Sequence, residues 1–269
     1  MIHPTAVIAP GAKIGANAEI GPYAVIDGEV TVGDNVRIGP HVHLTGITSI
    51  GDGTKIHTGA VIGDEPQDLH NTGAGCTTVI GKNCMIREYV TIHRGAAAGS
   101  STVVGDGVLL MAFCHLGHNC VLGDNSIIAN ATLLAGHVQV GQKTFISGGG
   151  LIHQFCRIGE FSIVGGGARL GQDIPPYCMY QWGGVGGPNA VGLKRNGFDP
   201  ATRSQIRKAI KIYFFSGLNR IAALAKIREE VGETMPAVKT FIEFLETTKR
   251  GIVPASNSDG EKENAESAG

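Results

Sequence analysis

Two histidines lie three residues apart in the stretch LLMAFCHLGHNC, residues 109–120. The imidazoles of His115 and His118 could hold a metal ion, act as acid and base, or pack inside a protein core. Which of these chemistries applies depends on what else the fold brings to the same place.

An aliphatic residue recurs at every sixth position along most of the chain. Steps of six from Ile2 reach only Ile, Val or Leu as far as Ile62, and the series resumes over 80–92 and 104–170. A small residue, often glycine, commonly follows. Neither an amphipathic helix nor an alternating strand has this period. It predicts an all-β solenoid, a parallel β-helix whose 18-residue coils have three short sides with one inward aliphatic side chain each.

Two breaks and a change in composition divide the chain. The six-residue period fails near 64–78 and near 96–101, where we expect loops expelled from the solenoid. We predict a β-helix over 1–190, with GGVGGP (183–188) as a turn-rich exit, and a small α-helical domain over 191–253. Asp199 and Pro200 have the residue types that begin a helix, and two more amphipathic segments follow. The polar tail 254–269 is expected to be disordered.

Bulk properties exclude several classes of function. The formal net charge of −1 gives no reason to expect nucleic-acid binding. We expect no signal peptide, and no apolar stretch in the sequence is long enough to span a membrane. Six scattered cysteines without a CxxC pair are typical of reduced thiols in a cytoplasmic protein.

Residues 18 apart should lie above one another in successive coils. This spacing stacks His118, Gly136 and Gln154, with His137 and His153 beside the stack. If the second break forms a loop outside the solenoid, His93 comes next to His118. His115 is expected at the corner before that side. Five of the ten histidines then share one strip of the solenoid, which indicates a functional site and not core packing.

The neighbours of these histidines distinguish between kinds of chemistry. Three histidines could hold zinc, but Gly136 and Gln154 are poor metal ligands. A histidine base beside a backbone N–H suits acyl transfer, so we expect no metal and no cofactor. The adjoining side stacks small residues at Ala112, Asn130, Gly148 and Gly166. Such a face could hold a chain of methylenes, pack closely against another subunit, or do both.

Several motifs resemble those of the acyl-ACP–UDP-N-acetylglucosamine O-acyltransferase family, whose β-helix is left-handed. They are QDL (67–69), VTIHRG (90–95), LLAGHV (133–138), IHQFC (152–156), DIPPY (173–177) and GLKRNGF (192–198). The resemblance spans nearly the whole chain. It implies transfer of an (R)-3-hydroxyacyl group from acyl carrier protein to the 3-hydroxyl of UDP-N-acetylglucosamine. That reaction is the first step of lipid A biosynthesis and is carried out by a cytoplasmic homotrimer.

The resemblance also implies roles for individual residues. His118 would be the general base, and the Gly136 N–H would stabilise the oxyanion. Gly166 falls where the family sets acyl-chain length. The other residues implied to contact the sugar, the phosphates, the acyl hydroxyl, the nucleotide or the carrier are Asp68, His70, His93, His115, His137, His153, Gln154, Asn189, Lys194 and Arg195.

Three positions depart from the family pattern. Asn119 replaces an acidic residue after the base histidine, His70 replaces a lysine, and Asn196 replaces an arginine. The first puts in question how the second imidazole nitrogen is held.

Other functions remain open from the sequence. A related enzyme could N-acylate a UDP-amino sugar, and a hexapeptide-repeat zinc hydratase or a non-catalytic scaffold would share the repeat. A cluster of basic residues is the candidate contact for an acidic carrier protein: Lys194, Arg195, Arg203, Arg207, Lys208 and Lys211.

Overall fold

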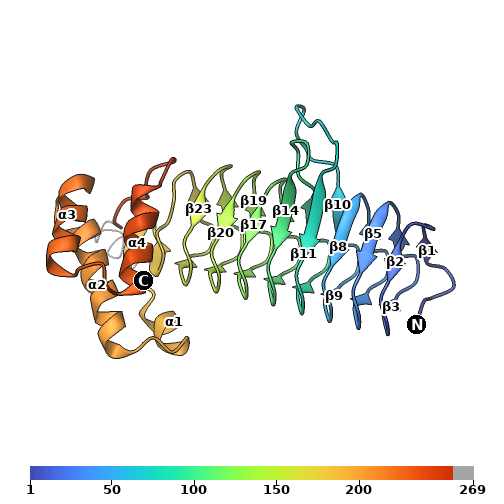
Figure 1. Cartoon of the computed structure of the whole chain (residues 1–269), viewed down its shortest axis with the longest axis horizontal. Coiled ribbons are helices and arrows are strands. Elements are labelled where there is room, and N and C mark those ends of the chain that lie inside the picture. Colours follow the sequence, from blue (N-terminus) through green and yellow to red (C-terminus); the bar gives the residue numbers. More distant parts are fainter. Residues whose placement is uncertain (257–269) are drawn as a thin grey trace, which may run out of the picture.

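The chain forms a long solenoid that ends in a group of helices (Figure 1). The computed structural model describes residues 1–256. The solenoid is a left-handed parallel β-helix, in which each coil gives one short strand to each of three parallel sheets, termed A, B and C. The fold class expected from the six-residue period is confirmed.

Within each sheet, neighbouring strands come from successive coils. Sheet A contains, in spatial order, β27 (Gly184–Pro188), β26 (Cys178–Gln181), β24 (Ile163–Val164), β21 (Phe145–Ile146), β18 (Ile127–Ile128), β15 (Leu109–Leu110), β12 (Met85–Ile86), β9 (Lys55–Ile56), β6 (Arg37–Ile38) and β3 (Glu19–Ile20). Sheet B contains β1 (Val7–Ile8), β4 (Val25–Ile26), β7 (His43–Leu44), β10 (Val61–Asp64), β13 (Thr91–His93), β16 (His115–Leu116), β19 (Leu133–Leu134), β22 (Leu151–Ile152) and β25 (Arg169–Leu170). Sheet C contains β2 (Lys13–Ile14), β5 (Glu29–Val32), β8 (Ile47–Ile50), β11 (Thr77–Ile80), β14 (Ser101–Val104), β17 (Val121–Leu122), β20 (Gln139–Val140) and β23 (Arg157–Ile158).

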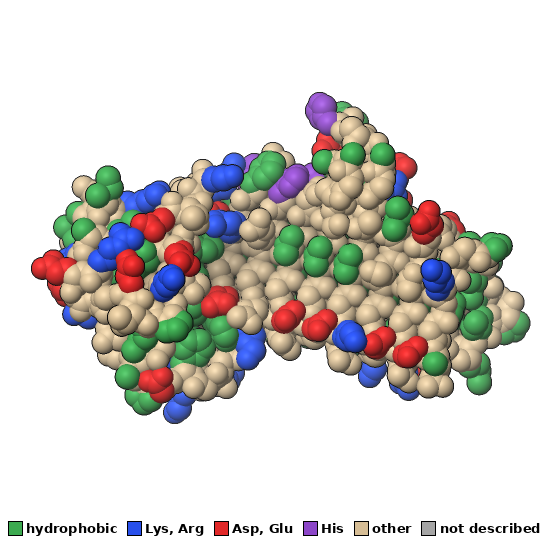
Figure 2. All heavy atoms as spheres, viewed as in Figure 1, with side chains coloured by type: hydrophobic (Ala, Val, Ile, Leu, Met, Phe, Trp, Pro, Cys, Tyr) green, Lys and Arg blue, Asp and Glu red, His purple; other side chains and the backbone are tan. Residues whose placement is uncertain are grey.

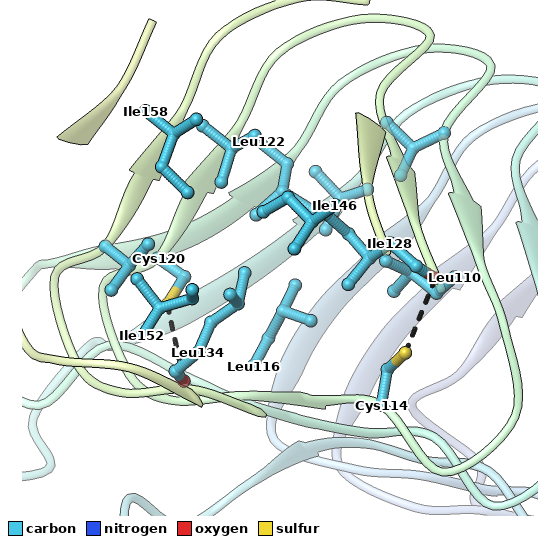
Figure 3. Packing of buried hydrophobic residues seen from close by; sticks show 14 of the residues in the cluster. Leu110, Cys114, Leu116, Cys120, Leu122, Ile128, Leu134, Ile146, Ile152 and Ile158 are labelled. Carbon is cyan, nitrogen blue, oxygen red and sulfur yellow. Dashed lines mark hydrogen bonds between the residues drawn. The ribbon is translucent and has the colours of Figure 1, made fainter. Parts of the chain in front are cut away.

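The recurring aliphatic residues fill the interior of the solenoid. From Ile20 to Leu170 every one of them is buried, and Figure 3 shows members from successive coils pointing into the axis. Ile2, Ile8 and Ile14 are only partly covered because they lie in the first coils, at the open end. The register between neighbouring coils matches the predicted stacking, for example Leu116 beside Leu134 and Leu134 beside Ile152.

The two breaks leave the solenoid as loops at the corner between sheets B and C. The first loop spans 65–76 and the second 94–100, each one or two residues different at its ends from what the sequence suggests. The loops are bonded to each other, since Thr72 N–H donates to Ala96 O and Gly99 N–H donates to Ala74 O. They project together from one edge of the solenoid (Figure 1). Expelling the second loop brings Ile92 into register with Leu116, as expected.

The end of the solenoid differs from the expectation in two details. GGVGGP is not merely a turn-rich exit, because its last five residues form β27, antiparallel to β26. Residues 254–256 are not disordered: Val185 donates to Pro254 O, and Ser256 donates to Val185 O. The rest of the predicted tail, 257–269, lies outside the described residues.

Four helices follow: α1 (Ala190–Arg195), α2 (Pro200–Phe215), α3 (Arg220–Glu230) and α4 (Pro236–Glu246). Asp199 caps α2 by accepting a hydrogen bond from Thr202 N–H, as its position before Pro200 predicts. The short helix α1 was not expected. Within residues 1–256, no helix has the length and apolar character needed to cross a membrane.

Candidate active site

A cavity of about 740 Å³ lies over the outer face of sheet B, beside the two loops. Its floor is the row of outward side chains at His115, Leu133, Leu151 and Arg169, which succeed one another on β16, β19, β22 and β25. His115 therefore lies on a strand and not at the corner where the sequence placed it. Figure 2 shows histidine side chains at the projecting loop and along the solenoid edge beside it.

His118 stands at the B–C corner and borders the cavity. Its Nδ1 is 2.9 Å from Asn119 Oδ1, and its Nε2 is 3.7 Å from Asp68 Oδ2. One ring nitrogen thus has an amide partner within the solenoid, while the other faces the cavity and the first loop. An imidazole held in this way can accept a proton from a molecule in the cavity.

Gly136 lies directly above His118 in the next coil. A Cβ added to Gly136 would be 2.5 Å from His118 Nε2 and 2.6 Å from its Cε1, so the imidazole occupies the space that any other residue would need. Among residues 1–256 the Gly136 N–H has no hydrogen-bond acceptor. A free backbone donor and a basic nitrogen therefore lie side by side on the cavity wall.

His93 and His115 lie deeper, on neighbouring coils, with ring centroids 4.9 Å apart. Burial lowers the pKa of His115 to about 4, with a smaller contribution from His93, and burial also lowers the pKa of His93. His115 Nδ1 is 2.7 Å from Thr91 Oγ1. Both imidazoles are consequently neutral near pH 7, so they can donate or accept hydrogen bonds without bringing a positive charge.

The first loop contributes one carboxylate to the cavity. Asp68 accepts a hydrogen bond from the His70 N–H, which is the main cause of its lowered pKa, and nearby His118 acts in the same direction. The side chain of His70 is 95% exposed and lies outside the cavity lining. Asp68 thus lines the cavity as expected, but His70 does not.

Three further predicted residues lie above His118. His153 and Gln154 line the cavity one coil above Gly136. His137 does not line it, but packs edge-on against His118 at 5.0 Å and stacks on Phe155 at 4.6 Å. Burial is the main cause of its lowered pKa. The structure thus places His137 against the ring of His118 and not in the cavity.

Cys114 and Cys120, which flank the two histidines, are buried in the solenoid core (Figure 3). Burial raises the pKa of Cys114 to about 11 and that of Cys120 to about 12. Neither can supply a thiolate nucleophile near neutral pH. Within residues 1–256, no three His, Cys, Asp or Glu side chains are grouped so that they could hold a metal ion.

Besides His70 and His137, four more predicted residues lie outside the main cavity. Gly166 lines a second cavity of about 530 Å³, which shares Arg169 with the first. Asn189 caps α1 and donates to Phe161 O, while Lys194 and Arg195 are exposed on α1. Within a single chain these three residues do not meet the histidines.

Two polar residues that line the cavity, Gln67 and Arg169, were not among the residues expected from the sequence. Arg169 could have been found, because steps of 18 from His115 reach Leu133, Leu151 and then Arg169. Gln67 lies in a loop without periodicity, and only its adjacency to Asp68 pointed to it.

Comparison with known proteins identifies the family to which this chain is similar. Residues 173–253 match the family model described as Udp N-acetylglucosamine O-acyltransferase, Domain 2, and three segments match the bacterial transferase hexapeptide model: 1–28, 12–46 and 101–136. Two relatives bear the name acyl-[acyl-carrier-protein]–UDP-N-acetylglucosamine O-acyltransferase. The one from Burkholderia lata is 39% identical, covering 94% of this chain and 98% of the relative. The one from Aliivibrio fischeri is 40% identical, with coverage of 94% and 97%.

Solved structures give the same result. A UDP-N-acetylglucosamine acyltransferase from Bacteroides fragilis superposes with a TM-score of 0.91 at 41% identity, covering 94% of this chain and 99% of that one. The corresponding enzyme from Francisella novicida also has a TM-score of 0.91, at 35% identity, with coverage of 97% and 96%. The chain belongs to the acyl-ACP–UDP-N-acetylglucosamine O-acyltransferase family.

Proposed function

We propose that this chain transfers an (R)-3-hydroxyacyl group from acyl carrier protein to the 3-hydroxyl of UDP-N-acetylglucosamine, the first step of lipid A biosynthesis. The relatives carry the name of this reaction, and the cavity offers the groups that it needs. The observation that carries the proposal is the closeness of His118 Nε2 to Gly136, where an added Cβ would lie 2.5 Å from that nitrogen.

The reaction follows from that arrangement. His118 Nε2 takes the proton of the sugar hydroxyl as its oxygen attacks the thioester carbonyl carbon. The carbonyl oxygen becomes an oxyanion, which the Gly136 N–H stabilises by about 3 kcal/mol if well aimed. When the intermediate collapses, the C–S bond breaks, and His118 returns its proton to the thiolate of the carrier. No metal or cofactor enters these steps.

Other residues around the cavity are proposed to bind and orient the substrates. Asp68, His115, His153 and Gln154 line the cavity and offer acceptors and donors to a sugar and to the acyl 3-hydroxyl. His93 also lines the cavity, and its buried Nδ1 has no hydrogen-bond partner among residues 1–256, so its ring is proposed to contact the substrate.

The second cavity, lined by Gly166, is proposed to take the acyl chain. An added side chain at Gly166 would meet only ordinary contacts, with Gly148 O at 3.6 Å, so its absence leaves space that an apolar chain could occupy. Each buried methylene would contribute about 0.8 kcal/mol.

The working enzyme is proposed to be a homotrimer. Sheet A carries an apolar outer row at the same coils that form the cavity, and the row consists of Met85, Leu109, Ile127, Phe145, Ile163 and Met179. Rotation about an axis parallel to the solenoid would set this row of one copy against sheet B of the next. It would close the cavity with a second wall.

The same arrangement gives a role to α1. This helix continues directly from β27 at the end of sheet A, so in such a trimer it would approach the cavity of a neighbouring copy. We propose that Asn189, Lys194 and Arg195 bind the nucleotide and the carrier there. His70, at an exposed position on the first loop, is proposed to contact substrate from above.

Acyl carrier protein is the proposed donor and partner. Arg207, Lys208 and Lys211 are exposed on α2 and could attract an acidic protein, although Lys208 is also paired with Glu230 at 3.1 Å. The six cysteines are free, as expected in a reducing compartment, which supports the cytoplasm as the site of action.

A product assay tests the function. Purified protein is incubated with acyl-ACPs of different lengths and with UDP-N-acetylglucosamine or its 3-amino analogue, and the products are identified by mass spectrometry. We expect a 3-O-acylated sugar. Product from the 3-amino analogue alone would assign N-acylation instead.

The base is tested in the same assay. His118→Ala should lower kcat at least about 100-fold, because the proton acceptor is lost, while UDP-N-acetylglucosamine still binds. Near-normal turnover by this variant would remove His118 from the proposed mechanism.

A further inference from the structure

A chain of hydrogen bonds joins both outside loops to the base histidine. Thr72, in the first loop, donates from N–H and Oγ1 to Ala96 O at 3.2 and 3.3 Å. Ala96, in the second loop, donates from its own N–H to Asn119 Oδ1 at 3.1 Å. The same oxygen lies 2.9 Å from His118 Nδ1. The Ala96 residue thus connects the first loop to the partner of the base.

These contacts fix the proton on the imidazole. A backbone N–H can only donate, so the Asn119 atom that faces Ala96 must be the carbonyl oxygen. Because that oxygen also faces His118 Nδ1, Nδ1 must carry the proton. Nε2 then has the free lone pair, and it is Nε2 that faces the cavity and Asp68.

An asparagine at residue 119 needs the Ala96 N–H to keep its oxygen facing His118, whereas an aspartate would not. Both oxygens of a carboxylate accept hydrogen bonds, so its rotation changes nothing for the imidazole. Rotating the Asn119 amide by half a turn would present its NH₂ group to Nδ1, and Nδ1 would have to accept. The proton would then move to Nε2, which could no longer act as a base.

We propose that the Ala96 N–H is a positioning group that locks Asn119 as an acceptor and so keeps His118 in the tautomer required for catalysis. The neutral partner also lets the base stay unprotonated to a lower pH than a carboxylate partner would. This inference rests on the proposed role of His118 in acyl transfer.

The surroundings of Asn119 restrict it further. Its φ of 62° lies in the left-handed region, which asparagine tolerates better than most residues. Its backbone N–H donates to the buried Thr102 Oγ1 at 2.8 Å. Ala96 itself is only 6% exposed, so water does not readily replace its N–H.

Other titratable groups face His118 and remain in place when residue 96 or 119 is changed. Asp68 lies 3.7 Å from Nε2, His137 packs on the ring from the coil above, and His93 lies on the coil beneath. Arg94, next to His93, is directed away to Gly63 O and Glu65. A shift in the pH dependence of activity that follows a change at residue 119 can therefore be attributed to that residue, because the other titratable groups around His118 are unchanged.

The first experiment is the pH dependence of kcat/KM for UDP-N-acetylglucosamine in wild-type enzyme, Asn119→Asp and Asn119→Gly. In N119D, the added negative charge should raise the pH at which activity is lost on acidification by about 1 unit, with the rate at higher pH kept or increased. N119G accepts the positive φ but lacks the oxygen, and kcat should fall by about tenfold or more. An acid limb in N119D identical to that of wild type would overturn the proposal.

The second experiment removes the Ala96 N–H with Ala96→Pro, alone and in N119D. We expect kcat to fall by about tenfold or more in the single variant, because the amide can rotate. In the double variant the further loss should be less than about threefold, because a carboxylate accepts in either orientation. Equal losses in both backgrounds would show that residue 96 only shapes the loop, and would overturn the proposal.

The two experiments separate the possible failures. A96P could disturb the loop, and its melting temperature is therefore measured. The N119D profile needs no change at residue 96 and tests the coupling between residue 119 and His118 separately. If wild-type protein makes no acylated sugar, the proposed function fails. If wild type is active and N119D shows no shift, only the positioning inference fails.

Discussion

At the scale of single residues, His118 and Gly136 share one small volume. A Cβ added to residue 136 would lie only 2.5 Å from His118 Nε2, so the imidazole leaves no room for it. We therefore expect Gly136→Ala to push the ring from its position and to lower kcat at least about 100-fold, since misplacing a catalytic group by about 1 Å has effects of this size. Steady-state kinetics with saturating substrates measures the loss.

A double variant shows whether the ring is the cause. In a His118→Ala background the space above the coil is free, so adding G136A should change neither the residual rate nor the melting temperature appreciably. A large further loss of stability in the double variant would mean that the methyl group collides with something other than the imidazole.

His115 makes the folding stability of the protein depend on pH. Its pKa in the folded state is about 4, below the value of about 6.5 in an unfolded chain. As the pH falls below about 6.5, the unfolded chain binds the proton first, so folding stability declines until about pH 4. The urea midpoint of His115→Gln should fall less between about pH 7 and about pH 5 than that of wild type. His3→Gln, at an exposed position away from the cavity, controls for loss of a histidine.

Single residues of the site could be predicted where the period applies. Steps of 18 place Gly136 above His118 and Gln154 above Gly136, because every coil repeats the same geometry. The position of Asp68 follows no such rule. Its carboxylate lies beside His118 because of the turn made by an irregular loop, and only the family resemblance indicated it.

At the scale of elements, a buried ion pair holds the helical end to the last coils. Asp173 is 1% exposed and accepts from Arg157 Nε, Arg157 N–H and Thr248 Oγ1. The same arginine donates to Phe244 O at the end of α4 and stacks on the Phe244 ring at 4.2 Å. This cluster joins the end of α4 to the solenoid, in addition to the buried apolar face of the helix.

Breaking this ion pair should loosen the helices first. Asp173→Asn leaves Arg157 partly buried without its counter-charge, a change that costs about 3 kcal/mol or more in comparable sites. We expect a lower melting temperature in circular dichroism, with the helical signal lost before the sheet signal. Asp124→Asn removes a carboxylate that accepts from Asp106 N–H at an exposed corner, and it should have little effect. Equal destabilisation by both changes would contradict a special role for Asp173.

The elements themselves were predictable to different degrees. The aliphatic period locates the strands from Ile20 to Leu170, since each inward residue marks one side of a coil. The hairpin of β26 and β27 has no such mark: its glycines resemble a turn, and it forms because β26 extends sheet A and β27 pairs with it. Likewise, the pairing of residues 254–256 with Val185 depends on a contact distant in the sequence.

At the scale of the whole molecule, the solenoid gives every coil a fixed height along its axis. The coil that carries His115 on sheet B carries Leu109 on sheet A, and the next coil pairs Leu133 with Ile127. A rotation axis parallel to the solenoid keeps these heights. The apolar row on sheet A of one copy would therefore lie opposite the cavity of its neighbour, and a chain alone would leave the cavity open on that side.

A charge in that apolar row tests the assembly. Ile127→Glu should fold, because the side chain points outward from sheet A, but burying its carboxylate between copies would be costly, so the trimer should dissociate. If the second wall comes from a neighbour, acyl transfer falls together with the mass measured by light scattering. Gln139→Glu places the same charge on the outer row of sheet C and should leave both unchanged. A fully active monomer of I127E would show that one chain encloses its substrates without a partner.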